Sequence, residues 1–262
     1  MSQELKIAIL PYDVAWGDKE ENLLSIGERL RRVDNNTDIV VLPELFTTGV
    51  VTDPSMVVNL AETNQDKTIR TMMYWAFEHN LAICGSFLAT TSGNYFNRAF
   101  FIEPSGEVTF YDKRHLFSID GEPEQFIKGN DKCEIIRYRG WNIYMVVGYD
   151  IRFPVWCRNI ENRYDIMLAM ASWPNTRAYS WRQLLIARAI ENQAYVIGGN
   201  RSGSDDYGIY DIGDSIIIDF KGNIISQLDT KNIIYAQLSK QELLMYRQKF
   251  PQCNDADKFT LL

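Results

Sequence analysis

Histidine and cysteine are scarce in this chain of 262 residues, which has two histidines and four cysteines. The histidines, at positions 79 and 115, have no cysteines or carboxylates clustered around them at metal-ligand spacing, and this disfavours a zinc site. The cysteines lie far apart, with no Cys-x-x-Cys pair, and a chain of this length does not require disulfide bonds. We therefore expect no metal, and a reducing, cytoplasmic compartment.

Long apolar runs and an excess of basic residues are also missing. No window approaches the roughly 18 uninterrupted apolar residues of a transmembrane helix, so no membrane span is expected. The first residues, MSQELKIAIL, resemble the start of a strand rather than a signal peptide. The net charge is −7, and no run of Lys and Arg is longer than the pair Arg31-Arg32. A nucleic-acid partner is therefore disfavoured, because phosphate binding needs a basic face.

Several common catalytic motifs are absent as well. The chain has no G-x-x-x-x-G-K-[ST], no G-x-G-x-x-G and no G-x-S-x-G, which argues against a P-loop, a dinucleotide fold and a nucleophile elbow. A serine triad would have to use His79 or His115. The first follows a helix pattern at an apparent surface position, and the second could be structural, so a histidine-based triad is disfavoured.

Apolar β-rich runs alternate with helical patterns along the whole chain. Strands are predicted at 6–10, 38–43, 81–89, 99–102, 108–111, 133–138, 142–147, 165–171, 195–199, 215–219 and 223–226, the last two as a pair. Helices are predicted at 23–30, 66–80, 181–193 and 239–248, and after Pro154. No linker or composition break interrupts the pattern. It indicates one domain, residues 1–262, of α/β or α+β class with mixed sheets.

Three polar segments follow buried strands, at the edge of the sheet where α/β proteins bind ligands. Glu44 follows the strand at 38–43, Lys113 follows the hairpin strand at 108–111, and Gly148-Tyr-Asp-Ile-Arg152 follows the strand at 142–147. Taken alone, each has a plain structural interpretation. The glutamate could bind backbone amides, the lysine could be solvated, and Asp150 and Arg152 could form a local ion pair.

Taken together, the segments PELFTTG, DKRHLF and GYDIRFP resemble, in this order, the carbon–nitrogen hydrolase (nitrilase) family. The resemblance continues through Ser172-Trp-Pro to Lys249-Phe-Pro251 and covers nearly the whole chain. The Thr-Thr-Gly, Trp-Pro and Lys-Phe-Pro segments are most similar to the omega-amidase branch. The resemblance implies a single-domain α+β fold, a four-layer α-β-β-α sandwich with mixed sheets. It also implies hydrolysis of the terminal amide of small carboxylic or 2-oxo acid amides.

The resemblance also assigns roles to residues. Glu44 matches the family's general base, and Lys113 matches the donor that stabilises the oxyanion together with the backbone N–H of Tyr149. Glu122 matches the second glutamate, with Glu124 left open as an alternative. Because the protein supplies base, donor and nucleophile itself, no cofactor is implied. The family usually forms homodimers, which places Pro154–Arg163 and the C-terminal segment at an interface.

One position departs from the family. Gly148 occupies the place of the nucleophilic cysteine, so this chain is expected to bind substrate without forming an acyl adduct. Cys157 is nine positions away on a predicted helix, roughly 13 Å at about 1.5 Å per residue, and is expected to be a packed thiol. Two histories remain open: an inactivated form of an amidase, which we favour, and a natural pseudoenzyme that serves as a small-molecule binding or interaction module.

The pocket candidates follow the strand at 165–171. Trp173, Asn175 and Arg177 could contact substrate, and a guanidinium suits the carboxylate of a 2-oxo acid, although Arg177 could equally be a surface residue. Thr48, with Thr47, could line the pocket or cap the turn. We expect Asp150 and Arg152 to brace the turn after position 148 and not to touch substrate.

Overall fold

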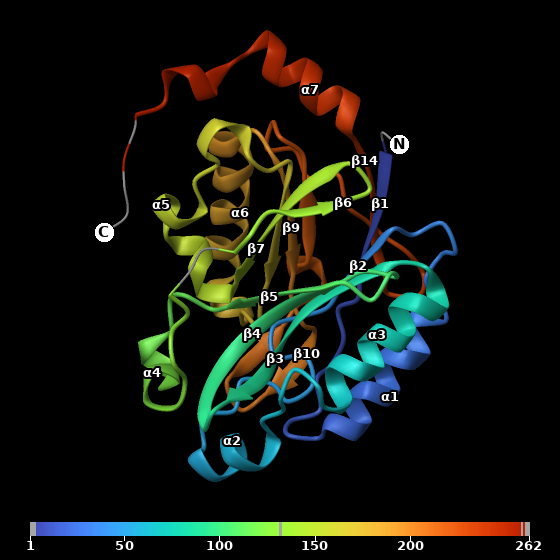
Figure 1. The fold of residues 1–262 in the computed structure, drawn as a ribbon, viewed down its shortest axis with the longest axis vertical. Helices are drawn as coiled ribbons and strands as arrows, with labels where there is room; N and C mark the ends of the chain where they lie inside the picture. The colour runs from blue at the N-terminus through green and yellow to red at the C-terminus, as the bar shows by residue number, and fades with distance from the viewer. Residues whose placement is uncertain (1–3, 131–132, 258, 260–262) are drawn as a thin grey trace.

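Two β-sheets stack face to face with helices on both outer sides, as Figure 1 shows for this computed structural model. The structure describes residues 4–130, 133–257 and 259. The predicted domain, residues 1–262, also includes residues 1–3, 131, 132, 258 and 260–262, which lie outside the described residues. The layers give an α-β-β-α order, so the predicted four-layer sandwich of α+β class with mixed sheets is confirmed.

The first sheet is mixed. Its strands run in the order β13 (Gln227–Leu228), β14 (Ile234–Ser239), β1 (Glu4–Ile9), β2 (Ile39–Val41), β3 (Ala82–Thr91), β4 (Asn94–Ile102) and β5 (Val108–Asp112). Strand β2 pairs in parallel with β1 and β3, whereas β3, β4 and β5 form an antiparallel meander. The parallel strands β1 and β2 therefore end at the same edge of the sheet.

The second sheet has a parallel centre. Its strands run in the order β12 (Ile216–Ile218), β9 (Tyr195–Gly199), β8 (Ile166–Met170), β7 (Trp141–Val147) and β6 (Ile136–Tyr138). Strands β7, β8 and β9 pair in parallel, and β12 and β6 pair antiparallel at the edges. A separate hairpin joins β10 (Gly203–Asp205) and β11 (Gly208–Tyr210).

Strand β1 shows why the central strands are apolar on both faces. Leu5, Ile7 and Ile9 belong to the core between the two sheets, while Ala8 belongs to the core beneath the outer helices. Successive side chains of a strand point to opposite faces, so a strand covered on both sides reads as a continuous apolar run.

The helices cover the outer faces of the sheets. On the first sheet lie α1 (Lys19–Leu30) and α3 (Lys67–His79), and on the second lies α6 (Ala178–Asn192) (Figure 1). Asp18 caps α1 by accepting a hydrogen bond from the backbone of Glu21. The shorter helices are α2 (Pro54–Leu60), α4 (Glu122–Gln125), α5 (Pro154–Cys157) and α7 (Lys240–Lys249). The 3-10 helices are η1 (Ser118–Asp120), η2 (Gly148–Arg152), η3 (Ile160–Asn162), η4 (Asn175–Arg177), η5 (Ile212–Asp214) and η6 (Gln252–Asp255).

Two local predictions are confirmed. The predicted helix after Pro154 is α5, a single turn, beyond which the buried side chain of Asn159 bonds both backbone groups of Tyr164 and so competes with helix continuation. The segment 223–226 returns antiparallel beside 215–219, as predicted: Ile224 bridges Ile218, and the backbone N–H groups of Asp219 and Ile225 donate to the carbonyls of Asn223 and Ile217. Strand β12 also pairs with β9. None of the helices in the described part of the chain is long and apolar enough to cross a membrane.

Candidate active site

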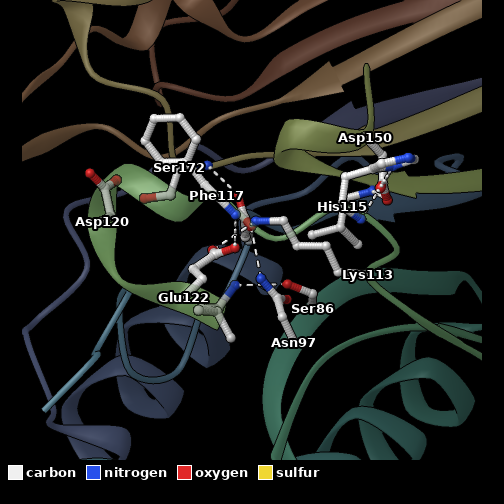
Figure 2. Close-up of polar contacts among 12 residues, drawn as sticks. Ser86, Asn97, Lys113, His115, Phe117, Asp120, Glu122, Asp150 and Ser172 are labelled. Carbon is white, nitrogen blue, oxygen red and sulfur yellow. Dashed lines mark hydrogen bonds and ion pairs between the residues drawn. The ribbon is translucent and has the colours of Figure 1, made fainter. Parts of the chain in front are cut away.

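Lys113 and two glutamates form a buried polar cluster between the two sheets. Lys113 follows β5 directly, and its Nζ lies 2.8 Å from Glu44 Oε1 and 2.7 Å from Glu122 Oε1. None of the three residues is more than 3% exposed. Figure 2 shows Lys113 and Glu122 pointing toward one another from different segments. The cluster places a cation between two carboxylates in a buried site.

Glu44 is held from several sides. Its Oε1 also accepts a hydrogen bond of 2.8 Å from the Asn97 side chain on β4, and its Oε2 accepts one of 3.0 Å from the backbone N–H of Ser172, just beyond β8. Glu44 itself lies just beyond β2 of the first sheet. Its partners lie on β4 of the same sheet and just beyond β8 of the second sheet, so both sheets hold the carboxylate. The carboxylate therefore has a fixed orientation, which is what a general base requires.

Glu122 is held in the same way. It begins the short helix α4, and its Oε2 accepts a hydrogen bond of 2.7 Å from the backbone N–H of Phe117. Burial raises the pKa of Glu122 against the opposing effect of the Lys113 charge. Burial alone lowers the pKa of Lys113, but the charges of Glu122 and Glu44 outweigh it, so this pKa is raised above its ordinary value. Lys113 is therefore a cation at neutral pH.

Position 148 faces this cluster. Gly148 follows β7 with a φ of +42°, a left-handed conformation that side chains disfavour. An ideal Cβ built on its backbone would contact the Glu44 carboxylate, lying 2.8 Å from Oε1 and 2.9 Å from Cδ. A side chain at this position would thus point directly at Glu44. In its absence, the carboxylate occupies that space.

A cavity of about 30 Å³ opens beside the cluster. Its lining consists of Glu44, Val50, Lys113, Phe117, Asp120, Glu122, Tyr149, Arg152, Ser172, Trp173 and Arg177. This volume holds about one water molecule. A cavity of about 610 Å³ beside Trp16 and Tyr207 contains none of the clustered residues.

The comparison with known families shows to which family the chain belongs. The model of the family described as "Carbon-nitrogen hydrolase" matches residues 6–248. The chain belongs to the carbon–nitrogen hydrolase family.

Relatives of this carbon–nitrogen hydrolase include "Omega-amidase YafV" of Escherichia coli strain K12, 42% identical with 98% of each chain covered. Another is "2-oxoglutaramate amidase" of Bacillus subtilis, 28% identical over 96% of this chain and 97% of that protein. Among solved structures, XC1258 from Xanthomonas campestris is 33% identical and covers 100% of both chains with a TM-score of 0.93. It is described as a CN-hydrolase superfamily protein with an arsenic adduct in the active site.

Most of the predicted site residues of this carbon–nitrogen hydrolase line the cavity, and the others lie away from it. Beside Glu44, Lys113 and Glu122, the residues Tyr149, Trp173 and Arg177 line the cavity. Glu124 is exposed, so of the two candidate glutamates it is Glu122 that contacts Lys113. Thr48 is fully buried away from the cavity lining, and its hydroxyl donates to the carbonyl of Gly49, which caps the turn. Cys157 is packed, as expected, and burial raises its pKa to about 12.

Arg152 lies in the turn after position 148 and also lines the cavity. Residue 152 ends η2, and its guanidinium lies 4.8 Å from the Trp173 ring centroid and 6.0 Å from that of Tyr149. The stacking turns the side chain toward the pocket, because a guanidinium favours the face of an aromatic ring.

Further residues of the site were missed by the sequence analysis, among them Asn97 and Asp120. Asn97 lies in a strand of mostly apolar residues, where a buried amide needs a hydrogen-bond partner, but the strand pattern does not show that this partner is Glu44. Asp120 Oδ2 lies 3.7 Å from Arg177 across the cavity. Among the residues described, no group of three or more His, Cys, Asp or Glu is placed to hold a metal ion.

Proposed function

We propose that this chain carries the active site of an omega-amidase, which hydrolyses the terminal amide of small carboxylic or 2-oxo acid amides, and that Gly148 deprives it of the nucleophile. The observation that carries the proposal is the convergence of Glu44, Lys113 and Glu122 on the point to which a side chain at position 148 would project. The relatives named "Omega-amidase YafV" and "2-oxoglutaramate amidase" support the substrate class.

The geometry suggests a mechanism for the form with cysteine at position 148. Glu44 takes the thiol proton, and the thiolate attacks the amide carbon. Lys113, with the backbone N–H of Tyr149, stabilises the oxyanion, and ammonia leaves with the proton returned by Glu44. Water then hydrolyses the thioester by the same route. Glu122 holds Lys113 in place and orients the attacking water. The proposed scheme needs no metal or cofactor.

Arg177 and Trp173 are the proposed contacts for the substrate's far end. Arg177 is partly exposed, with its guanidinium 4.6 Å from the Phe117 ring centroid at the cavity. A guanidinium binds a carboxylate with two parallel hydrogen bonds, which suits a 2-oxo acid. Arg152, also at the cavity, adds positive charge to the same region.

The second candidate is a binding or interaction module on the same fold. It is favoured by one observation, namely that the Glu44 carboxylate fills the space a side chain at position 148 would take. We favour the inactivated amidase, because a pseudoenzyme under relaxed selection would be expected to lose Glu44 or Lys113 as well. We also propose a cytoplasmic homodimer.

The deciding experiment compares this chain with its Gly148→Cys variant. With 2-oxoglutaramate, the variant should release ammonia and show an acyl adduct by mass spectrometry, and chelator should leave this activity intact. The unaltered chain should show no adduct, since removing a protease nucleophile costs on the order of 10⁶ in kcat. Adding Glu44→Gln to the variant should abolish turnover again. If the Gly148 chain hydrolyses the amide as fast as its variant, the nucleophile lies elsewhere and the assignment is wrong.

A further inference from the structure

Asp150 is a fully buried carboxylate that lies two residues beyond Gly148. Its Oδ2 accepts hydrogen bonds from the Tyr111 hydroxyl at 2.7 Å and from the backbone N–H of Val147 at 3.1 Å. Its Oδ1 accepts one from the backbone N–H of His115 at 2.9 Å and lies 2.8 Å from the Nδ1 of the same residue. Both oxygens are therefore fully used.

These partners come from two different sheets. Tyr111 lies on β5 and His115 follows it, so they stand two residues before and two residues after Lys113. Val147 ends β7 and directly precedes Gly148. Strand β5 is the edge of the first sheet, and β7 belongs to the second. The Asp150 carboxylate thus connects residues on both sides of Lys113 to the turn at position 148. Figure 2 shows the contact between Asp150 and His115.

The surroundings keep this junction rigid. The His115 ring stacks on Phe153 with centroids 3.7 Å apart and planes 10° apart. The Tyr111 hydroxyl, which donates to Asp150, also accepts a hydrogen bond of 2.9 Å from Trp156 Nε1. Phe153 and Trp156 both follow the turn at position 148. The segment after the turn therefore contacts His115 and Tyr111 directly, in addition to the bonds made by Asp150.

We infer that Asp150 is a positioning residue that sets the distance between the Lys113 amino group and the atom attached at position 148. The inference rests on the proposed function, because that distance matters only if the two groups act on one substrate. It goes beyond bracing of the turn, since the bonds to Tyr111 and His115 reach the other sheet.

Chemistry predicts what asparagine would do at this position. The carboxylate faces donors with both oxygens, whereas an amide offers one oxygen and one NH₂ group. If the amide oxygen faces Tyr111 and Val147, the bond from the His115 backbone N–H is lost, and the reverse orientation loses the bond from the Val147 backbone N–H. Either way, one part of the junction is released without a change in side-chain size.

The test uses the full-length Gly148→Cys chain with and without Asp150→Asn. We expect kcat for 2-oxoglutaramate to fall roughly 10- to 100-fold, because small misplacements of reacting groups cost this much. KM should change less than about threefold, since the substrate contacts remain. The pH profile of iodoacetamide alkylation of the introduced thiol should move upward, because a displaced Lys113 stabilises the thiolate less.

The matched control is Asp165→Asn in the same background. Asp165 is also a buried carboxylate and accepts from Arg247 and the backbone of Asn142, but it precedes β8, at the end of the sheet away from position 148. The control should lose stability while it keeps kcat and the alkylation profile. If Asp150→Asn fails to fold, Tyr111→Phe removes one bond of the junction and should shift kcat and the profile in the same direction.

The outcomes separate the two proposals. If the Gly148→Cys chain has no amidase activity, the proposed function fails, and an alkylation profile that still shifts with Asp150→Asn supports the positioning role. If that chain is active and Asp150→Asn affects kcat and the profile no more than Asp165→Asn does, the positioning role is overturned.

Discussion

At the scale of single residues, the site depends on the charge of Lys113. Its amino group lies between the carboxylates of Glu44 and Glu122, and all three side chains are buried. A buried carboxylate without a cation strongly destabilises the folded state, whereas a buried carboxylate paired with a cation costs little folding free energy. The same cation that would stabilise an oxyanion therefore also stabilises the fold.

Lys113→Met should lower the free energy of unfolding by about 3–5 kcal/mol at pH 7, because it leaves two buried carboxylates unpaired. The folded-state pKa of Lys113 is raised above the ordinary value of 10.5, so its stabilising effect is complete below that pH and is lost as the pH rises through the folded pKa. In urea denaturation, the difference in unfolding free energy between the unaltered chain and the variant should be the same at pH 7 and pH 9. It should be smaller at pH 11. Lys128→Met, at an exposed lysine, is the control, and an equal effect of both changes would refute the pairing.

Gly148 illustrates a conflict between stability and chemistry. Its φ of +42° is costly for any other residue, and a Cβ would press on the Glu44 carboxylate. A nucleophile at this position must therefore displace Glu44 and accept a strained backbone. Strain of this kind is common at active sites, where the surrounding structure holds it in place.

Gly148→Ala should accordingly lower the free energy of unfolding by about 1–3 kcal/mol. Gly213→Ala is the matched control, because a Cβ there meets no atom within 4 Å, and its effect should stay within about 0.5 kcal/mol. Thermal and urea unfolding of the two variants give the comparison. An alanine at position 148 that leaves stability unchanged would contradict the strained geometry.

At the scale of elements, two short segments face each other across the cavity. The segment of η1 and α4 carries Asp120 and Glu122, and η4 ends at Arg177, whose guanidinium lies 3.7 Å from Asp120. Both members of this pair are partly exposed, so the pair itself adds little to stability. Under the proposed function, we expect Arg177 to exchange Asp120 for a substrate carboxylate at small cost.

Arg177→Met in the Gly148→Cys chain should raise KM for 2-oxoglutaramate about 10- to 100-fold, since a hydrogen bond to a charged group contributes about 1.5–3 kcal/mol. KM for an uncharged small amide, such as propionamide, should stay the same. Steady-state ammonia release with both amides measures the two values. Equal changes for both substrates would show that Arg177 shapes the pocket and does not recognise the acid.

At the scale of the whole molecule, the strand pattern predicted an α/β or α+β class with mixed sheets, and the resemblance to the carbon–nitrogen hydrolase family predicted the four-layer sandwich. Glu44 and Lys113 could be found because each follows an apolar strand. Asn97 could not, because its contact with Glu44 depends on the register of β4 against β5, where its carbonyl accepts from the Lys113 N–H. A slip of one residue would turn Asn97 to the other face, and the sequence pattern does not fix that register.

Assembly is a property of the molecule that we predict from its outer surface. The predicted interface, Pro154–Arg163 with the C-terminal segment, exposes large apolar side chains, including Val155 at 46%, Ile160 at 40% and Phe250 at 53%. Stable dimers bury about 800 Å² on each partner, with a largely apolar centre. Such residues on neighbouring segments supply a centre of that kind.

Light scattering after size exclusion should therefore give twice the chain mass of 30.3 kDa. Val155→Asp combined with Ile160→Asp should give the mass of one chain, because a carboxylate buried in an apolar interface has no partner to offset its desolvation. Phe77→Asp is the control, since Phe77 is 74% exposed on α3, on the opposite outer layer, and its change should leave the dimer intact. If the control breaks the dimer and the double variant does not, the subunits meet through the α1 and α3 layer. A monomeric unaltered chain would refute the interface and leave the site geometry untouched, because every residue of the buried cluster comes from one chain.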